Sequence, residues 1–598
     1  MRLPSLIVIL LFWPILLSAQ TDAVTFSQPG GFYEASFTLS LHCGTGNHIR
    51  YTTNGDIPNA SSTLYTDPLL LDESLYSKSN IYTIVNCIPS TYYHPEHVQR
   101  AIVIRAAVFN SDEVRISPIT TNSYFIEALG CNFHGLPVAS IVTDSLSLFD
   151  YETGIFIPGI YYDPSDSTHT GNYCQTGREW ERLINLEFYE PDNTGINQPC
   201  GLRIHGGASR WFQQKGMRVY AREEYGKKRF KHKFFKSTPI VSFKHLCFHP
   251  FRCSHWLQTG GQEHLSQTVA AELNFENLAV RQTVVFINGE YWGIYTLEES
   301  PDERYLEDHF DVDLDQVCLI KYWGVPQYGD PEDWRAFRSW IENADLSQPE
   351  DSAYAYSRID VDSFIDYMIY ETYSANLDWP QNNVLHWQPE AGEQFRWIFF
   401  DGDGCFINPS YHAMAHAFDI GGDDWIFSKF LGNASFKDAF FSRYIQLLET
   451  SFSLSHLTAV LGQYQHIVEG EIAAQSERFH FPESFEKWQS DMGKAIEFFR
   501  DRNSYFIEEI LTYISVKETW IDAFTCVPNP SFGSFSIRLH SETSNLLPIE
   551  IFDIMGRKVA HKELYLTKGE NSIPVQTNLA SGLYLIKIND LTERIVIQ

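Results

Sequence analysis

The stretch LDWPQNNVLHWQPEAGEQFRWIFFDGDGCF, residues 377–406, places polar groups on both sides of a short apolar segment. It follows the run DVDSFIDYMIYETYSAN at 360–376, in which apolar residues recur at helical spacing. Pro380 ends this predicted helix and fixes the loop that follows. Within that loop Asp378 lies five residues before Asn383.

The second half of the stretch is an apolar strand, FRWIFF, that ends in DGDG at 401–404. The glycines allow a tight turn that presents Asp401 and Asp403, and hard cations such as Mg²⁺ take oxygen ligands of this kind. A carboxylate that orients a hydroxyl, such as Asp378, and an amide oxygen that binds Mg²⁺, such as Asn383, are what phosphoryl transfer needs from a loop. An ordinary helix end and a solvated acidic turn remain open as alternatives.

Upstream, the motif RIHGGASR at 203–210 joins two predicted strands. Paired glycines, here Gly206 and Gly207, let backbone N–H groups approach a phosphate closely, and Ser209 and Arg210 add donors. A plain turn between two strands is the alternative interpretation of this motif.

The strand after that motif, QQKGMRVYA at 213–221, carries two positive charges, Lys215 and Arg218. Side chains alternate along a strand, so these two are expected on opposite faces. A regular strand therefore directs only one of them into a cleft.

Residues 135–515 are rich in predicted strands in their first half and in predicted amphipathic helices in their second half. This indicates an α+β, two-lobed domain, and Asn288-Gly289 between two apolar strands predicts a hairpin. The Gly-rich loop, basic strand, D-x-x-x-x-N loop and D-x-D turn follow in the order in which kinase-like folds supply phosphate, base and metal groups.

The segment 135–515 resembles the CotH (spore coat protein H) family of atypical secreted kinases. Besides these motifs, the resemblance is carried by the WER…EFYE strand at 180–190, the hairpin NGEYWGIYTLEE at 288–299 and the closing helix FFRDRNSYF at 498–506. It implies a kinase that uses ATP and Mg²⁺ to phosphorylate Ser or Thr of exported proteins, itself included.

The resemblance also implies roles for particular residues. Asp378 is the expected catalytic acid/base, and Lys215 the expected contact to the ATP phosphates. Glu298 ends the hairpin, where a kinase-like hinge meets adenine. The metal ligands it implies are Asn383, Asp401 and Asp403, and the nucleotide-binding residues are Gly206, Gly207, Ser209, Arg210, Lys215, Arg218 and Glu298.

Residues 243–268, FKHLCFHPFRCSHWLQTGGQEHLSQT, depart from the family pattern, which has an L-R-x-x-G-like stretch and an aspartate near the place of Gln267. The alternative function is therefore a catalytically inactive kinase-fold scaffold, or a surface protein that binds glycan or protein. Histidines and cysteines alternate in this region in a pattern open to Zn²⁺ or Cu ligation and to a Cys247–Cys253 disulfide: His245, Cys247, His249, Cys253 and His255.

The two ends of the chain predict export. The first 20 residues, MRLPSLIVILLFWPILLSAQ, pair one basic residue with an apolar run that is short for a bilayer anchor, as is typical of a signal peptide. Residues 523–598, with VPNPSFGSFSIRL, IEIFDIMGRKVA and SGLYLIKI, resemble the C-terminal sorting domain of type IX secretion, a small all-β sandwich. The resemblance implies a secreted or cell-surface protein, with the type IX machinery as partner. No later stretch approaches the roughly 18 apolar residues needed to span a bilayer, so we expect no transmembrane anchor in the mature chain.

Residues 24–127 alternate apolar and polar positions between turns, and their motif IRYTTNGDIPNASSTLYTDPL resembles the chitobiase C-terminal β-sandwich. This leaves a cell-surface glycan as a candidate partner. The formal net charge of −31 argues against nucleic-acid binding, which needs a basic face. Ten cysteines in an exported chain permit disulfides, with Cys43–Cys87 the first pair to test.

Overall fold

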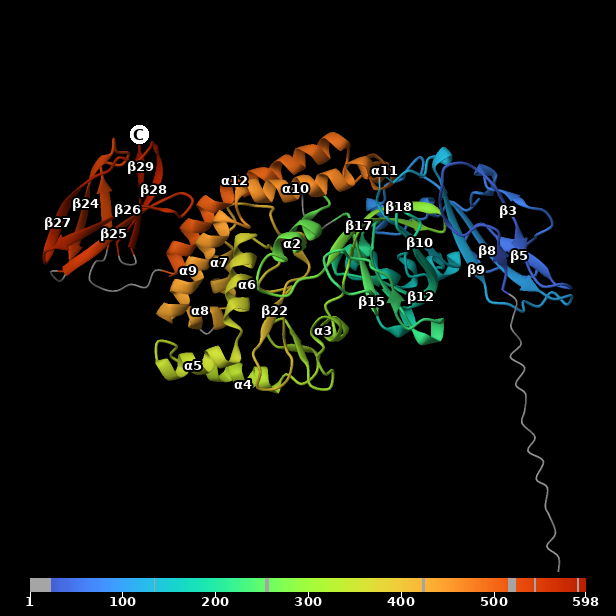
Figure 1. Cartoon of the computed structure of the whole chain (residues 1–598), viewed down its shortest axis with the longest axis horizontal. Helices are drawn as coiled ribbons and strands as arrows, with labels where there is room; N and C mark the ends of the chain where they lie inside the picture. The colour runs from blue at the N-terminus through green and yellow to red at the C-terminus, as the bar shows by residue number, and fades with distance from the viewer. Residues whose placement is uncertain are drawn as a thin grey trace, which may run out of the picture.

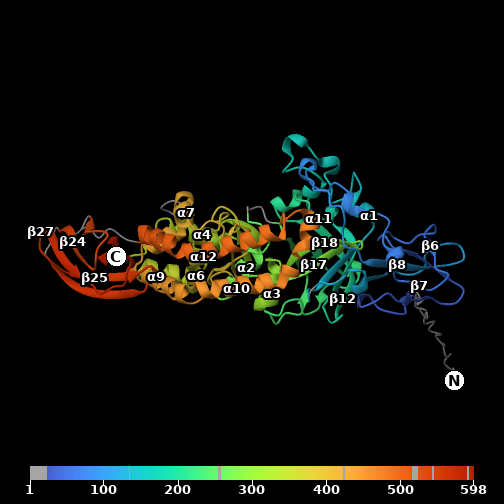
Figure 2. The same cartoon turned by 90° about the horizontal axis from the view of Figure 1, so that it is seen from above.

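The computed structural model describes residues 23–133, 135–252, 257–421, 425–514, 523–541, 545–588 and 591–598. The chain is elongated, with a β-rich N-terminal module at one end, a mixed region of strands and helices in the middle, and an all-β module at the other end (Figures 1 and 2). This order confirms the predicted fold class. The predicted signal peptide at 1–20 lies outside the described residues. In these ranges no helix is long and apolar enough to cross a membrane.

The N-terminal module holds nine short strands: β1 (Thr25–Phe26), β2 (Gly31–Tyr33), β3 (Thr38–Leu39), β4 (Leu41–His42), β5 (His48–Thr52), β6 (Thr63–Leu64), β7 (Leu69–Leu70), β8 (Ile102–Phe109) and β9 (Thr120–Ile126). Five of them form one sheet in the order β2-β9-β8-β5-β6. Alternation along β9 gives the sheet two buried faces, because Tyr124 packs in the core of the module and Phe125 packs toward the central region. The module is therefore fixed to its neighbour by packed side chains.

The first half of the central region is a closed barrel of seven strands. These are β10 (Val138–Val142), β11 (Arg182–Tyr189), β12 (Gly195–His205), β13 (Gly216–Tyr220), β16 (His245–Pro250), β17 (Val280–Ile287) and β18 (Glu290–Glu298). The order around the barrel is β10-β11-β12-β13-β16-β18-β17, and β10 closes it by pairing parallel to β17. The predicted hairpin at Asn288-Gly289 joins β17 to β18, and both residues have positive φ, as a type I′ turn requires.

The second half of the central region is helical, around a small sheet of order β20-β19-β21-β22. Its strands are β19 (Cys318–Lys321), β20 (Val325–Tyr328), β21 (Leu385–Gln388) and β22 (Arg396–Ile398). Its helices are α2 (Gln262–Ala270), α3 (Glu303–Phe310), α4 (Glu332–Ile341), α5 (Pro349–Arg358), α6 (Val361–Tyr373), α7 (Ala413–Gly421), α8 (Ile426–Leu431), α9 (Ala434–Glu449), α10 (Leu454–Val468), α11 (Ile472–Phe479) and α12 (Phe485–Ile514). The predicted helix at 360–376 corresponds to α6, which begins at its N-cap Asp360 and is buried along nearly all of its length.

The C-terminal module consists of two sheets that face each other across an aliphatic core. One sheet contains β23 (Phe524–Val527), β24 (Ser534–Ser541) and β27 (Gly569–Gln576). The other contains β25 (Asn545–Asp553), β26 (Lys558–Leu566), β28 (Gly582–Ile588) and β29 (Leu591–Ile597). Ile537 from the first sheet and Ile586 from the second are fully buried in this core.

The segment 71–100 leaves the N-terminal module and packs on the barrel. There the side-chain amide of Asn86 donates to the carbonyl of Gln213, at 2.9 Å. Cys87 belongs to this segment and is buried beside the barrel, whereas Cys43 lies at the sheet of the N-terminal module. Both residues are thiols, so the expected Cys43–Cys87 disulfide does not form. Cys253, of the expected Cys247–Cys253 pair, lies outside the described residues.

Candidate active site

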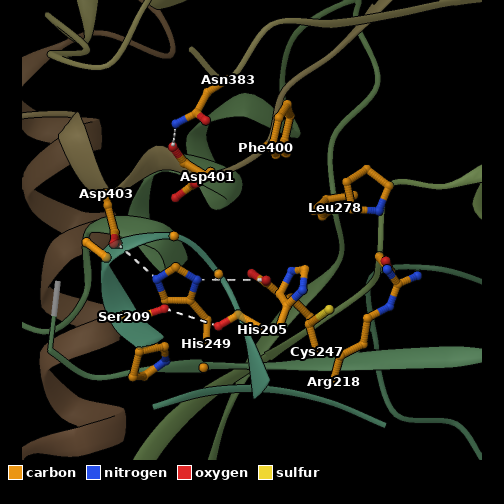
Figure 3. A pocket seen from close by; sticks show the side chains of 18 of the residues that line it. His205, Ser209, Arg218, Cys247, His249, Leu278, Asn383, Phe400, Asp401 and Asp403 are labelled. Carbon is orange, nitrogen blue, oxygen red and sulfur yellow. Dashed lines mark hydrogen bonds and ion pairs between the residues drawn. The ribbon is translucent and has the colours of Figure 1, made fainter. Parts of the chain in front are cut away.

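A cleft of about 440 Å³ lies where the barrel meets the helical region (Figure 3). The loop after β12 and strands β13, β16 and β18 form its barrel side. The loop after α6 and the turn after β22 form its other side. The cleft brings together most of the residues predicted from the sequence: Gly206, Gly207, Ser209, Arg218, Glu298, Asp378, Asn383, Asp401 and Asp403.

Two predicted residues, Lys215 and Arg210, are not among those that line the cleft. The ammonium of Lys215 donates to the carbonyls of Arg210 and Phe212, at 2.7 and 2.9 Å, and lies 4.1 Å from the ring centre of Tyr173. Burial lowers the pKa of Lys215 to about 7. The guanidinium of Arg210 donates to the carbonyls of Gly206 and Tyr173. Both side chains therefore brace the Gly-rich loop from behind.

Arg218 on β13 lines the cleft, whereas Lys215, which directly precedes β13, does not. Asp302 and His245 hold the Arg218 guanidinium in place: Asp302 pairs with it, and Nδ1 of His245 lies 3.0 Å from it. Asp302 is also the N-cap of α3, where its other oxygen accepts two backbone N–H groups. The cation that faces the cleft is thus fixed to the start of a helix.

Backbone geometry positions the two aspartates after β22. Asp401 has a φ of 60° and leads into the short 3₁₀ helix η11 (Gly402–Gly404). A Cβ on Gly402 would meet the hydroxyl of Ser266 at 1.9 Å, so only glycine fits at this point against α2. The side-chain amide of Asn383 donates to the carbonyl of Asp401, at 3.3 Å. The D-x-D turn and the D-x-x-x-x-N loop are therefore in direct contact.

The loop that carries Asp378 is anchored at both ends. The backbone N–H of Asp378 donates to Oδ1 of Asn376, at 3.1 Å, and the carbonyl of Asp378 accepts the N–H of Asn382, at 2.9 Å. Asn376 in turn donates to the buried carboxyl of Glu371, at 2.8 Å. These bonds fix the backbone of the loop from which the Asp378 side chain lines the cleft.

His249, which the sequence analysis did not connect with the aspartates, lies beside them in the cleft (Figure 3). Its Nε2 is 3.1 Å from Oδ1 of Asp403, and its Nδ1 is 3.8 Å from Oε1 of Glu298. One donor atom from each of His249, Asp401 and Asp403 can be chosen such that all lie within 4.8 Å of one another. Because β16 alternates, the H-x-C-x-H pattern at 245–249 does predict a common face, but not the loop that this face meets.

The charged groups of this cluster shift one another's pKa values. Burial, with the neighbouring charge of Asp403, raises the pKa of Asp401 to about 7. Burial alone lowers the pKa of His249, but the charges of Asp403 and Glu298 outweigh it and raise that pKa well above 6.5. Burial also raises the pKa of Glu263 on α2, whose carboxylate accepts the N–H of Gly402. The site holds more negative charge than one imidazole balances, which is what a cation-binding site requires.

At the place where the family pattern expects an aspartate, the structure has a buried glutamine. The side-chain amide of Gln267 donates to Glu263, at 2.9 Å, and its oxygen accepts the N–H of Leu278, also at 2.9 Å. Gln267 therefore joins α2 to the wall of the cleft and holds Glu263 in place.

Three family models match the chain in the predicted order. The model described as CotH kinase protein matches residues 202–506. The chitobiase/β-hexosaminidase C-terminal domain matches residues 28–78, and the secretion system C-terminal sorting domain matches residues 526–598. These matches confirm the three resemblances drawn from the sequence motifs.

Comparisons with whole proteins add less. A search of curated proteins found no match. Among solved structures, the chain is similar to the Helicobacter pylori proinflammatory kinase CtkA, at 10% sequence identity and a TM-score of 0.27. The similarity covers 53% of this chain and 96% of that one.

Proposed function

Because this chain belongs to the CotH kinase protein family and carries a secretion system sorting domain, we propose that it is an exported protein kinase. It transfers the γ-phosphoryl group of ATP to Ser or Thr hydroxyls of exported proteins. The observation that carries this proposal is the convergence of Asp378, Asn383 and the D-x-D turn with the Gly-rich loop and Arg218 in one cleft.

The residues of the cleft fit a metal-bound nucleotide. Asp401 and Asp403 offer carboxylate oxygens, and Oε2 of Glu298 is buried without a hydrogen-bond partner in the described part of the chain. Gly207 has open space where a Cβ would be, so its backbone is accessible to a phosphate. A bound Mg²⁺ ion supplies charge neutralisation for the phosphate oxygens. Asp401 and Asp403 would hold it, with Asn383 next to them.

Asp378 provides the acid/base group of the transfer. The substrate hydroxyl oxygen forms its bond to the γ-phosphorus as the bond from that phosphorus to the β-γ bridging oxygen breaks. The proton of the hydroxyl passes to Asp378, and ADP leaves with the bridging oxygen. Arg218, held by Asp302, stabilises the negative charge on the transferring group.

The test is transfer of labelled phosphate from ATP by the full chain, with its own serines and threonines and an added exported protein as acceptors. We expect Asp378→Asn to lower the rate by about 10²-fold or more, the range of lost acid–base catalysis. The matched control is Asp501→Asn, which makes the same change on the exposed side of α12 and should leave the rate unchanged.

A rate that is the same in wild type and Asp378→Asn would reject the catalytic role of Asp378. No labelling at all, with retention of the chain on a cell-surface glycan or protein, would support the alternative of a scaffold without catalysis. In that case the buried Gln267, in place of the family aspartate, is the feature to examine first.

The sorting domain implies secretion or attachment at the cell surface. We further propose that residues 1–20 direct the chain across the inner membrane and that the type IX machinery recognises 523–598. The β-sandwich at 24–127 and the kinase domain at 135–515 are then exposed outside the cell. The N-terminal module serves as a spacer or, as an accessory role, binds a surface glycan.

A further inference from the structure

We propose that the cleft contains a histidine-bearing site that takes a divalent transition metal in preference to Mg²⁺. Its ligands are His249, Asp401 and Asp403, and Glu298 holds the imidazole of His249 in place. How the metal is used rests on the kinase function proposed above, but its binding does not.

The first observation is the geometry of the cluster. The three ligands come from strand β16 and the turn after β22, which are about 150 residues apart in sequence and meet only in the fold. Their donor atoms lie within 4.8 Å of one another, and Nε2 of His249 is already 3.1 Å from Oδ1 of Asp403. Two atoms that coordinate one ion commonly lie at about this separation, since metal–ligand bonds are about 2.0–2.2 Å long.

The second observation is a buried carboxylate oxygen without a partner. Glu298 is 8% exposed and lines the same cleft. In the part of the chain that the structure describes, its Oε2 has no hydrogen-bond partner, and its Oε1 is 3.8 Å from Nδ1 of His249. Glu298 thus lies on the Nδ1 side of the ring and Asp403 on the Nε2 side, so this carboxylate orients the imidazole with Nε2 toward the aspartates.

The ligand set decides the class of metal. Mg²⁺ in proteins is bound almost entirely by oxygen and keeps several waters, whereas an imidazole nitrogen favours first-row transition metals. Mn²⁺ is a first-row transition metal ion that, like Mg²⁺, also binds carboxylates, so it serves as the probe of this preference. In this proposal Glu298 therefore supports the metal ligand His249, rather than an adenine hinge.

The experiment uses the full chain, stripped of metal with a chelator and without nucleotide, and Mn²⁺ as the probe. Pulsed electron paramagnetic resonance should detect ¹⁴N coupling from an imidazole to the bound Mn²⁺. In competition, Mn²⁺ should bind at least about tenfold more tightly than Mg²⁺. His249→Gln should remove the ¹⁴N coupling and weaken Mn²⁺ by about 10-fold to 100-fold.

The matched control is His205→Gln, because His205 lines the same cleft outside the cluster. This variant should keep the ¹⁴N coupling. If His249→Gln fails to fold, Glu298→Gln replaces it, and the expected result is weaker Mn²⁺ binding with the ¹⁴N coupling retained.

Bound Mn²⁺ without ¹⁴N coupling in the wild type would overturn the proposal, as would equal affinity for Mn²⁺ and Mg²⁺. In either case His249 acts only as a positive charge among the carboxylates. If the ¹⁴N coupling survives in His249→Gln and disappears in His205→Gln, the ligand is His205, and the assignment of His249 is wrong. Coupling without any phosphate transfer would leave this site standing and reject the kinase function instead.

Discussion

At the scale of single residues, Asp302 links the start of a helix to the chemistry of the cleft. One of its oxygens caps α3, and the other pairs with Arg218 and lies 2.8 Å from Nδ1 of His245. Burial alone raises the pKa of Asp302, but the bond from His245 and the charge of Arg218 outweigh it and place that pKa below 3.8. A depressed carboxyl pKa means that the pair contributes stability above the ordinary carboxyl range and loses it as the pH falls.

The variant Asp302→Asn tests this link, because asparagine caps a helix as well as aspartate but carries no charge. Arg218 would then be a largely buried cation without its carboxylate. We expect a loss of about 3 kcal/mol in the free energy of unfolding at pH 7, measured by denaturant unfolding. The loss should shrink below pH 4, where Asp302 of the wild type becomes protonated. A double-mutant cycle with Arg218→Met provides the control, since a full loss in that background would assign the effect to something other than the pair.

The residues of the cleft were predictable where the signal is local. The loop with Asp378 and Asn383, and the turn with Asp401 and Asp403, each stand within a few residues of a helix end or strand end. His249 was not connected with them, because its contact with Asp403 spans 154 residues. Strand alternation predicted that only one of Lys215 and Arg218 would face the cleft. The resemblance pointed to Lys215, whereas the structure has Arg218 there.

At the scale of elements, the packing of α2 on η11 sets the shape of the D-x-D turn. Gly402 touches the side chain of Ser266, and its N–H donates to Glu263 one turn earlier on the same helix. The turn therefore has a fixed distance to α2.

We expect Gly402→Ala to lower the stability of the central region by about 1–3 kcal/mol, because the added methyl overlaps Ser266. Its melting temperature, followed by near-ultraviolet circular dichroism, measures this. The control is Gly462→Ala in the interior of α10, where a Cβ would meet nothing within 4 Å. That change should raise the stability by about 0.5–1 kcal/mol. Equal effects of the two variants would show that the contact with Ser266 is not tight.

Among the elements, the hairpin at Asn288-Gly289 and helix α6 were predictable, since each follows from spacing and turn residues within a short window. The closure of the barrel was not, because β10 and β17 pair across more than a hundred residues of chain. The path of 71–100 over the barrel was also missed. Its short 3₁₀ turns have no repeating pattern, and its partners, such as Gln213, lie in a distant part of the sequence.

At the scale of the whole molecule, two buried glutamates fasten the N-terminal module and the segment 71–100 to the barrel. Glu187 on β11 accepts hydrogen bonds from the backbone and hydroxyl of Ser123 on β9. Glu290 on β18 accepts the N–H groups of Ile81 and Tyr82. Burial raises the pKa of each carboxyl to about 7. Both are therefore protonated at mildly acidic pH and become charged inside the junction above neutrality.

A raised carboxyl pKa contributes stability that is full below about 4.5 and is lost as the pH rises through 7. We expect the junction to weaken between pH 5 and pH 8, by up to about 3 kcal/mol for each glutamate. Limited proteolysis of 71–100 as a function of pH measures this. Glu290→Gln, which resembles the protonated acid at the carboxyl that holds 71–100, should flatten the pH dependence. A dependence that is unchanged in the double variant with Glu187→Gln would contradict the assignment.

The closed barrel has a further consequence, for the order in which the protein folds. Strands β10 to β13 precede β17 in the chain, so as the chain emerges they form a sheet whose β10 edge stays open until β17 arrives, more than a hundred residues after β10. During that interval the edge offers unpaired backbone groups to other chains, which is the setting in which nascent strands aggregate. Closure is thus a late, long-range event that slows folding of the central region.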